Sequence, residues 1–235
     1  MGPVAGPPGT GKTTFIKALI KIAERLGIKI IFVQAKDCSE SWLEVPGADA
    51  VIKRISSVLH FTVSDGFRPS FDALRKANCA DIQCLIDYAK KRYKPDVSEW
   101  IETRLELLSS LFIKGDKIVI PLCLANEDEL IRRLLVGILY VLRSRISKPI
   151  IMDDMLSFVT NEPYSEAFAA MMRPYMFSVN RNLDSREMLL YNPIIITPGG
   201  QGGHYRLAEP HKYVILFDSY RWTIPKKDIE KIVRP

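Results

Sequence analysis

The sequence predicts an α/β fold in which a mainly parallel sheet is flanked by helices on both faces. Three observations predict it: short apolar segments without polar alternation, helical periodicity between these segments, and a glycine-rich loop close to the first residue. Continuous apolar segments are typical of strands buried in parallel sheets, and their alternation with helices is typical of α/β proteins.

The individual elements follow from the same patterns. The predicted strands are Val4–Ala5, Ile28–Val33, Lys117–Leu122, Pro149–Met152, Pro193–Thr197 and Tyr213–Phe217, with Met176–Val179 as a further candidate. The predicted helices are Thr14–Leu26, Ser70–Asn78, Ala80–Arg92, Asp96–Phe112, Asn126–Ile146 and Ser165–Met172. Gly27 directly follows the first helix and is expected to end it.

We expect one domain over residues 1–235, with residues 66–114 as a helical insertion packed on its core. The alternative is that these helices are ordinary parts of the same sheet. Only Val4–Ala5 can form a strand before the glycine-rich loop. We therefore expect either a minimal protein with a very short first strand or a fragment of a longer one.

The composition is that of a soluble globular protein, with 47% hydrophobic and 26% charged residues. No uncharged apolar run approaches the roughly 18 residues of a membrane span, and the first residues lack the pattern of a signal peptide. The four cysteines, Cys38, Cys79, Cys84 and Cys123, form no C-x-x-C pair. This favours reduced thiols without zinc and a cytoplasmic location, including a host cytoplasm or a virion. The scarcity of glutamine beside abundant Ile, Lys, Arg and Glu favours a thermophilic source.

The stretch "GPPGTGKTT" fits the spacing G-x-x-x-x-G-K-[ST] of a phosphate-binding loop. Its glycines let backbone N–H groups turn toward an anion, and the following helix directs its positive end to the same place. We expect Lys12 to reach the β- and γ-phosphates and Thr13 to bind Mg²⁺. The predicted cofactors are ATP and Mg²⁺. The predicted nucleotide-binding residues are Gly6, Pro7, Pro8, Gly9, Thr10, Gly11, Lys12, Thr13 and Thr14.

A second motif, "PIIMDDM", places two acids at the end of an apolar strand. We expect Asp153 to hold Mg²⁺ and Asp154 to orient and deprotonate the attacking water. Glu162 and Glu166 are the alternatives for the base. A pair of acids favours water activation over phosphate transfer to a small-molecule substrate.

Polar and basic residues after this strand are candidates for sensing and stabilising the phosphate. Asn180 ends the apolar stretch Met176–Val179 and can position the water or report the phosphate state. Arg173 is the predicted finger that stabilises charge on the transferred phosphoryl group, with Arg181 and Arg186 as alternatives.

A phosphate-binding loop and an acidic strand separated by other strands resemble the additional-strand class of P-loop ATPases, which have a RecA-like sheet. The spelling "GPPGTGKTT" is similar to AAA+ proteins and superfamily 1 helicases. Four stretches resemble the HerA/FtsK clade of DNA-pumping ATPases, which includes viral packaging motors: "IIFVQAKD", "KIVIPLCLANEDELIRRLLVGILYVLRSRISKPIIMDD", "FSVNRNLDSREML" and "NPIIITPGG". No helical lid of the AAA+ kind is recognisable in Ser219–Pro235.

The resemblance implies ATP-driven translocation of double-stranded DNA by a homo-oligomeric ring, in packaging or transfer of viral or plasmid DNA, with a capsid or replication protein as a further partner. The net charge is +6, and four of these charges lie in residues 171–235. Basic residues there are expected to meet DNA phosphates: Arg206, Lys212, Arg221, Lys226 and Lys227. One alternative is an AAA+-type switch or loader acting on proteins or replication origins. Another is a small-molecule kinase or a binding module without turnover.

Overall fold

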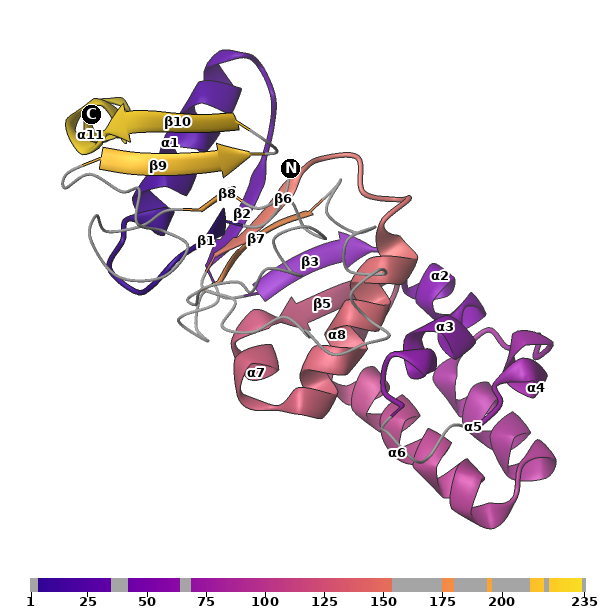
Figure 1. Ribbon diagram of the computed structural model, residues 1–235. Coiled ribbons are helices and arrows are strands. Elements are labelled where there is room, and N and C mark those ends of the chain that lie inside the picture. Colours follow the sequence, from indigo (N-terminus) through magenta and orange to yellow (C-terminus); the bar gives the residue numbers. More distant parts are fainter. Residues whose placement is uncertain are drawn as a thin grey trace. The chain divides into compact units, whose positions relative to one another are not determined.

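The computed structural model describes residues 4–34, 42–63, 69–153, 175–179, 194–195, 212–217 and 220–233. The chain folds into two compact units (Figure 1). The first comprises Met1–Lys36 and Ser147–Pro235, and the second comprises Asp37–Ile146. The expected insertion, residues 66–114, lies within the second unit. No helix in the described ranges has the length and apolar character needed to cross a membrane.

The first unit is built around a parallel sheet. Its described elements are β1 (Val4–Ala5), α1 (Lys12–Arg25), β2 (Ile31–Gln34), β6 (Ile150–Asp153), β7 (Tyr175–Val179), β8 (Ile194–Ile195), β9 (Lys212–Phe217), β10 (Tyr220–Pro225) and α11 (Lys226–Val233). The strand order in the sheet is β2-β6-β7-β1-β8, and every neighbouring pair is parallel. The predicted mainly parallel sheet is therefore confirmed.

Helix α1, which directly follows the glycine-rich loop, packs on the core of this unit. Phe15, Ile16 and Ala18 of α1 are buried in one cluster with Val4 of β1 and Ile151 of β6. Helix α11 packs against α1, and Lys21 donates to the carbonyl of its residue Val233 at 2.6 Å.

Gly27 ends α1, as predicted. Its φ of 73° is favourable for glycine, and its N–H donates to the Glu24 carbonyl. The Ile28 N–H donates to the Ala23 carbonyl, which completes the two hydrogen bonds of a Schellman motif.

The second unit is mainly helical. Its described elements are β3 (Trp42–Pro46), α2 (Ala48–Lys53), α3 (Ile55–His60), α4 (Asp72–Arg75), α5 (Ile82–Arg92), α6 (Pro95–Leu111), β4 (Ile113–Lys114), β5 (Lys117–Pro121), α7 (Leu122–Glu127) and α8 (Glu129–Leu142). Helix α5 packs on α6, and α3 packs on α8. Gly137 of α8 permits the second contact, since an added Cβ would lie 2.8 Å from the Val58 carbonyl oxygen.

Two predicted parallel strands are antiparallel. Lys117–Leu122 corresponds to β5, which pairs antiparallel with β3 and β4 in the second unit. Tyr213–Phe217 corresponds to β9, which forms an antiparallel hairpin with β10. In β5 the consecutive residues Ile118, Val119 and Ile120 are all buried. An apolar segment of this kind has the same pattern whether its neighbours run parallel or antiparallel, so the sequence could not distinguish them.

The predicted helices are largely confirmed, with one division. The expected helix Asn126–Ile146 is split at Asp128, whose carboxylate accepts a hydrogen bond from the Ile131 N–H at 2.9 Å and caps α8. The expected helix Ser165–Met172 lies outside the described residues.

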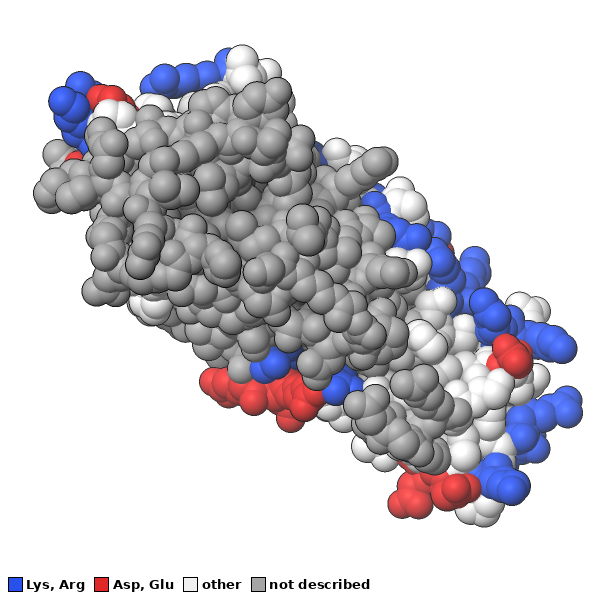
Figure 2. All heavy atoms as spheres, in the orientation of Figure 1, with Lys and Arg blue, Asp and Glu red and all other residues white. Residues whose placement is uncertain are grey.

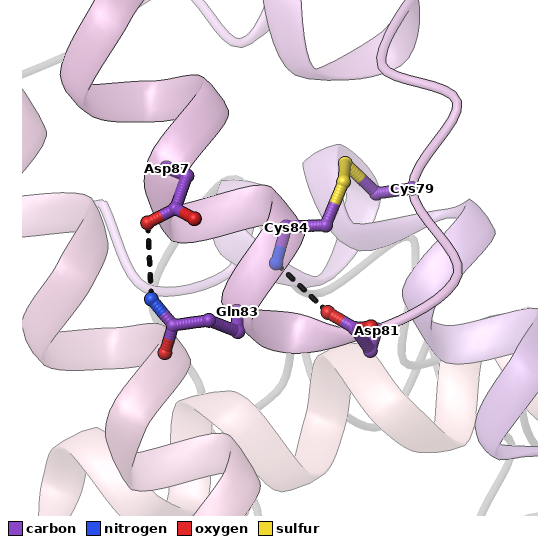
Figure 3. The surroundings of a disulfide bond; sticks show 5 residues. All are labelled: Cys79, Asp81, Gln83, Cys84 and Asp87. Atoms are coloured by element: carbon purple, nitrogen blue, oxygen red, sulfur yellow. Dashed lines mark hydrogen bonds between the residues drawn. A yellow bond between two sulfur atoms is a disulfide. The ribbon is translucent and has the colours of Figure 1, made fainter.

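The prediction of reduced cysteines is wrong. Cys79 and Cys84 are joined by a disulfide at the start of α5, with their Cα atoms 5.5 Å apart (Figure 3). Cys123 is also disulfide-bonded. Asp81 caps α5 by accepting from the Cys84 N–H, and this turn brings the two cysteines together. A C-x₄-C spacing does not reveal such a turn. Because these cysteines are oxidised, they do not support a cytoplasmic location.

Candidate nucleotide-binding site

The loop between β1 and α1 has the backbone of an anion cradle. Gly9 and Gly11 have φ values of 76° and 92°, which glycine adopts without strain. A Cβ added at Gly9 would meet no atom within 4 Å, so open space lies beside the loop. Successive N–H groups in such turns, followed by a helix N-terminus, form a favourable site for phosphate.

Lys12 lies inside this loop. Its side chain is only 4% exposed, and Nζ donates to the carbonyl oxygens of Gly6 at 2.9 Å and Pro7 at 2.8 Å. The Thr10 hydroxyl donates to the same Pro7 carbonyl at 3.0 Å. The loop therefore holds a buried ammonium group at the N-terminus of α1, where an anionic ligand would meet it.

A row of side chains crosses the sheet at the ends of its strands. Gln34 of β2 is in register with Asp153 of β6, and Ser178 of β7 is in register with Val4 of β1. Register partners in a sheet point to the same face. Because Val4 packs against α1, the row lies on the face of the sheet that α1 covers. Val4 precedes the first residue of the loop by two positions.

Asp153 and Ser178 meet within this row. Both are fully buried, and the Ser178 hydroxyl donates to Oδ1 of Asp153. Oδ2 of Asp153 is buried without a hydrogen-bond partner among the described residues. An unsatisfied buried carboxylate oxygen is costly, and carboxylate oxygens are the ligands that Mg²⁺ prefers. The residues present thus fit a magnesium ion held by Asp153.

The strand order decides the class of the fold. Strand β7 lies between β1, which enters the loop, and β6, which carries Asp153. The fold is that of an additional-strand P-loop ATPase. Comparisons with known proteins agree with this fold.

The sequence model of the family described as "ATPase family associated with various cellular activities (AAA)" matches residues 4–65 of this P-loop ATPase fold. Among solved structures, VirB4 of Thermoanaerobacter pseudethanolicus is similar, with a TM-score of 0.51 and 12% sequence identity. The match covers 95% of this chain and 88% of the VirB4 chain. No curated protein sequence matches the chain. The prediction of a RecA-like P-loop ATPase fold is confirmed.

The structure places part of the predicted site. All nine residues of the loop motif, Gly6 to Thr14, lie at the junction of β1 and α1, and Asp153 ends β6. Asp154, Asn180 and Arg173 lie outside the described residues, as do the alternatives Glu162, Glu166, Arg181 and Arg186.

Ser178 is the site residue that sequence reasoning missed. It is the one hydroxyl in the apolar segment Met176–Val179 and stands two positions before Asn180. A single hydroxyl within an apolar strand segment, close to a predicted sensor residue, is the signal that could have found it.

Proposed function

We propose that this chain hydrolyses ATP and uses the energy to translocate double-stranded DNA as part of a homo-oligomeric ring. The observation that carries the ATPase half is the arrangement at the strand ends. Buried Lys12 lies in the phosphate-binding loop, and buried Asp153 lies two strands away, with one carboxylate oxygen that has no hydrogen-bond partner in the described part of the chain.

Each residue has a defined part in this proposal. The loop N–H groups and Lys12 bind the triphosphate, and Thr13 and Asp153 hold Mg²⁺. When bound, Mg²⁺ neutralises charge on the phosphates. Asp154 accepts the proton of the attacking water, and Asn180 orients that water. Arg173, supplied by a neighbouring copy of the chain, stabilises the transferred phosphoryl group.

The DNA half rests on the positive charge of the chain and on the hairpin of β9 and β10. Lys212 is in register with Pro225, which directly precedes Lys226 and Lys227, so the hairpin brings three basic residues to one end. Figure 2 shows Lys and Arg side chains, together with Asp and Glu side chains, in the region of α11. Contacts of this kind bind phosphates without reading base sequence.

The specific process, the partner protein and the location are also proposed. The same resemblance to DNA-pumping ATPases supports packaging or transfer of viral or plasmid DNA with a capsid or replication protein, in a cytoplasm or a virion. The match of residues 4–65 to the AAA model favours a second candidate, an AAA+-type switch or loader. That candidate requires a protein partner and turnover that does not respond to naked DNA.

The test is ATP hydrolysis with and without double-stranded DNA at low and high salt. We expect stimulation that weakens steeply as salt rises, because counterion release drives the binding. Exposed Lys227 provides a variant, Lys227→Glu. It should reduce by about 1 the slope of the logarithm of DNA affinity against the logarithm of salt concentration. Lys76→Glu, an exposed lysine of the second unit, is the matched control and should behave as the wild type. Turnover that ignores DNA at low salt would contradict the motor and favour the switch.

A further inference from the structure

We propose that Ser178 is a positioning residue for the metal site: its hydroxyl holds Asp153 so that Oδ2 remains available to Mg²⁺. This inference rests on the proposed ATPase function and deepens it. The residue acts through Asp153 and does not contact the nucleotide in this account.

The placement of Ser178 supports this role. It lies on β7, the strand between Asp153 and the strand that enters the phosphate-binding loop. Its Cα is in register with Val4, and its hydroxyl donates across to Oδ1 of Asp153. Neither Ser178 nor Asp153 is exposed to solvent, so water does not compete for this contact.

The hydrogen bond from Ser178 makes the two carboxylate oxygens of Asp153 chemically different. A serine hydroxyl has one proton to donate, and here Oδ1 receives it. Oδ2 then stays an acceptor without a partner among the described residues, which is the state a cation ligand requires. The terminal torsion of aspartate is broad, so a carboxylate without this hydrogen bond would rotate more freely. When a residue that hydrogen-bonds to a metal-binding side chain and orients it is removed, metal affinity typically falls roughly 10- to 100-fold.

Gln34 is the other polar neighbour in the row, and it does not offer the same support. It is in register with Asp153 from β2 and is half-buried. No hydrogen bond joins the Gln34 side chain to Asp153 among the described residues. The orientation of Asp153 is therefore assigned to Ser178.

The experiment measures Mn²⁺ affinity by electron paramagnetic resonance on the full chain saturated with a non-hydrolysable ATP analogue. Ser178→Ala should bind Mn²⁺ roughly 10- to 100-fold more weakly, while binding of a fluorescent ATP analogue in EDTA should stay unchanged. Ser178→Thr keeps the hydroxyl and should recover most of the affinity. Ser98→Ala removes a buried hydroxyl from α6, where it donates to Pro95, and should match the wild type.

The outcomes are distinct. If Ser178→Ala binds Mn²⁺ within twofold of the wild type, Ser178 has only a structural role and the inference is wrong. Should Ser178→Ala fail to fold, Ser178→Cys replaces it, because a thiol of similar size is a weak donor and should also lose affinity. If wild-type turnover ignores DNA while the Mn²⁺ difference persists, the motor proposal fails and this inference stands. If the wild type binds no Mn²⁺, the inference fails together with the metal role of Asp153.

Discussion

The unit that carries the phosphate-binding loop buries ionisable side chains near the ends of its strands. In the described part of the second unit, the polar residues that are buried carry hydroxyls. Lys12 and Asp153 are the buried ionic groups of the first unit within the described ranges. Ser56, Thr62 and Ser98 are their counterparts in the second. Burying a charge is costly unless a partner or a ligand compensates for it. Under the proposed function, the nucleotide and its metal ion would compensate for the buried charges of the first unit.

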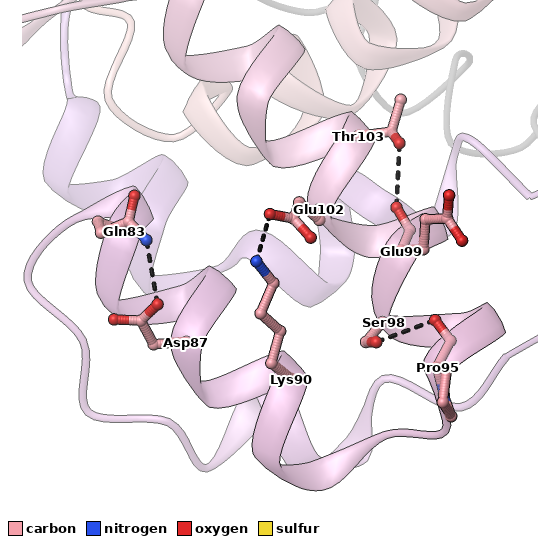
Figure 4. Close-up of polar contacts among 8 residues, drawn as sticks. All are labelled: Gln83, Asp87, Lys90, Pro95, Ser98, Glu99, Glu102 and Thr103. Carbon is pink, nitrogen blue, oxygen red and sulfur yellow. Dashed lines mark hydrogen bonds and ion pairs between the residues drawn. The ribbon is translucent and has the colours of Figure 1, made fainter.

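Charged groups of the second unit pair instead at its surface. Lys90 of α5 contacts Glu102 of α6, and this hydrogen bond raises the pKa of Lys90 (Figure 4). Arg104 is the partial exception. It stacks over Trp100 and donates to Thr62, and its partial burial, with the nearby charge of Arg133, lowers its pKa to about 10. Surface pairs of this kind contribute little to stability, so the second unit depends on its apolar packing.

The largest expected effect is on the chemistry of the first unit. Asp154→Asn should leave ATP bound and reduce turnover by roughly 10²- to 10⁴-fold, because the amide cannot accept the proton of the water. Steady-state hydrolysis and equilibrium nucleotide binding measure the two halves. Normal hydrolysis by Asp154→Asn would contradict the assignment of the base, and Glu162 and Glu166 would be substituted next.

A core substitution in the second unit should change stability without changing the site. Leu105 of α6 is fully buried, so Leu105→Ala should lower the free energy of unfolding by about 2–5 kcal/mol. Its exposed neighbour Glu106 gives the control, Glu106→Ala, with little expected effect. Urea denaturation measures stability, and binding of the ATP analogue below the transition should match the wild type. Loss of binding by the folded variant would contradict the separation of the two roles.

Removing the disulfide should have a smaller effect on the same unit. Replacement of Cys79 and Cys84 by serine releases a short loop, which corresponds to about 2 kcal/mol in the chain-entropy relation. Thermal unfolding without reductant compares the double variant with the wild type. Equal midpoints would mean that the bridge does not restrain the unfolded chain.

The smallest effect concerns a surface pair and depends on pH. Arg145 donates to both carboxylate oxygens of Asp49, at 2.8 and 3.1 Å, and this lowers the pKa of Asp49 below its usual 3.8. The pair therefore contributes stability above about pH 4, and the contribution is lost as the pH falls through the lowered pKa. Asp49→Asn should melt slightly below the wild type at neutral pH and converge with it in acid. In an Arg145→Ala background the same substitution should have a smaller effect, since only the Ala50 N–H and the charge of Lys53 then act on Asp49. An undiminished difference there would contradict the pairing.

Local patterns predicted much of the fold. The loop motif, the helix that Gly27 ends and the apolar strand before Asp153 each depend on residues close together in the sequence, and each lies where it was expected. The direction of β5 could not be predicted, because its pairing with β3 and β4 is a tertiary choice that leaves no mark on an apolar segment.

Like the fold, the candidate site was predicted only in part. Lys12 and Asp153 follow from their motifs. The contact between Ser178 and Asp153 joins residues that are 25 positions apart and depends on register, which a single sequence does not specify. The Cys79–Cys84 bridge depends likewise on the turn capped by Asp81.

The most direct test of the account compares ATP hydrolysis by the wild type, Lys12→Ala and Lys17→Ala in Mg²⁺, with and without double-stranded DNA. Lys17 lies on the same helix as Lys12 but is exposed, which makes it the matched control. We expect Lys12→Ala to lose turnover under both conditions, while Lys17→Ala and the wild type hydrolyse ATP and are stimulated by DNA. Turnover by Lys12→Ala equal to that of Lys17→Ala would contradict the site at the ends of the strands.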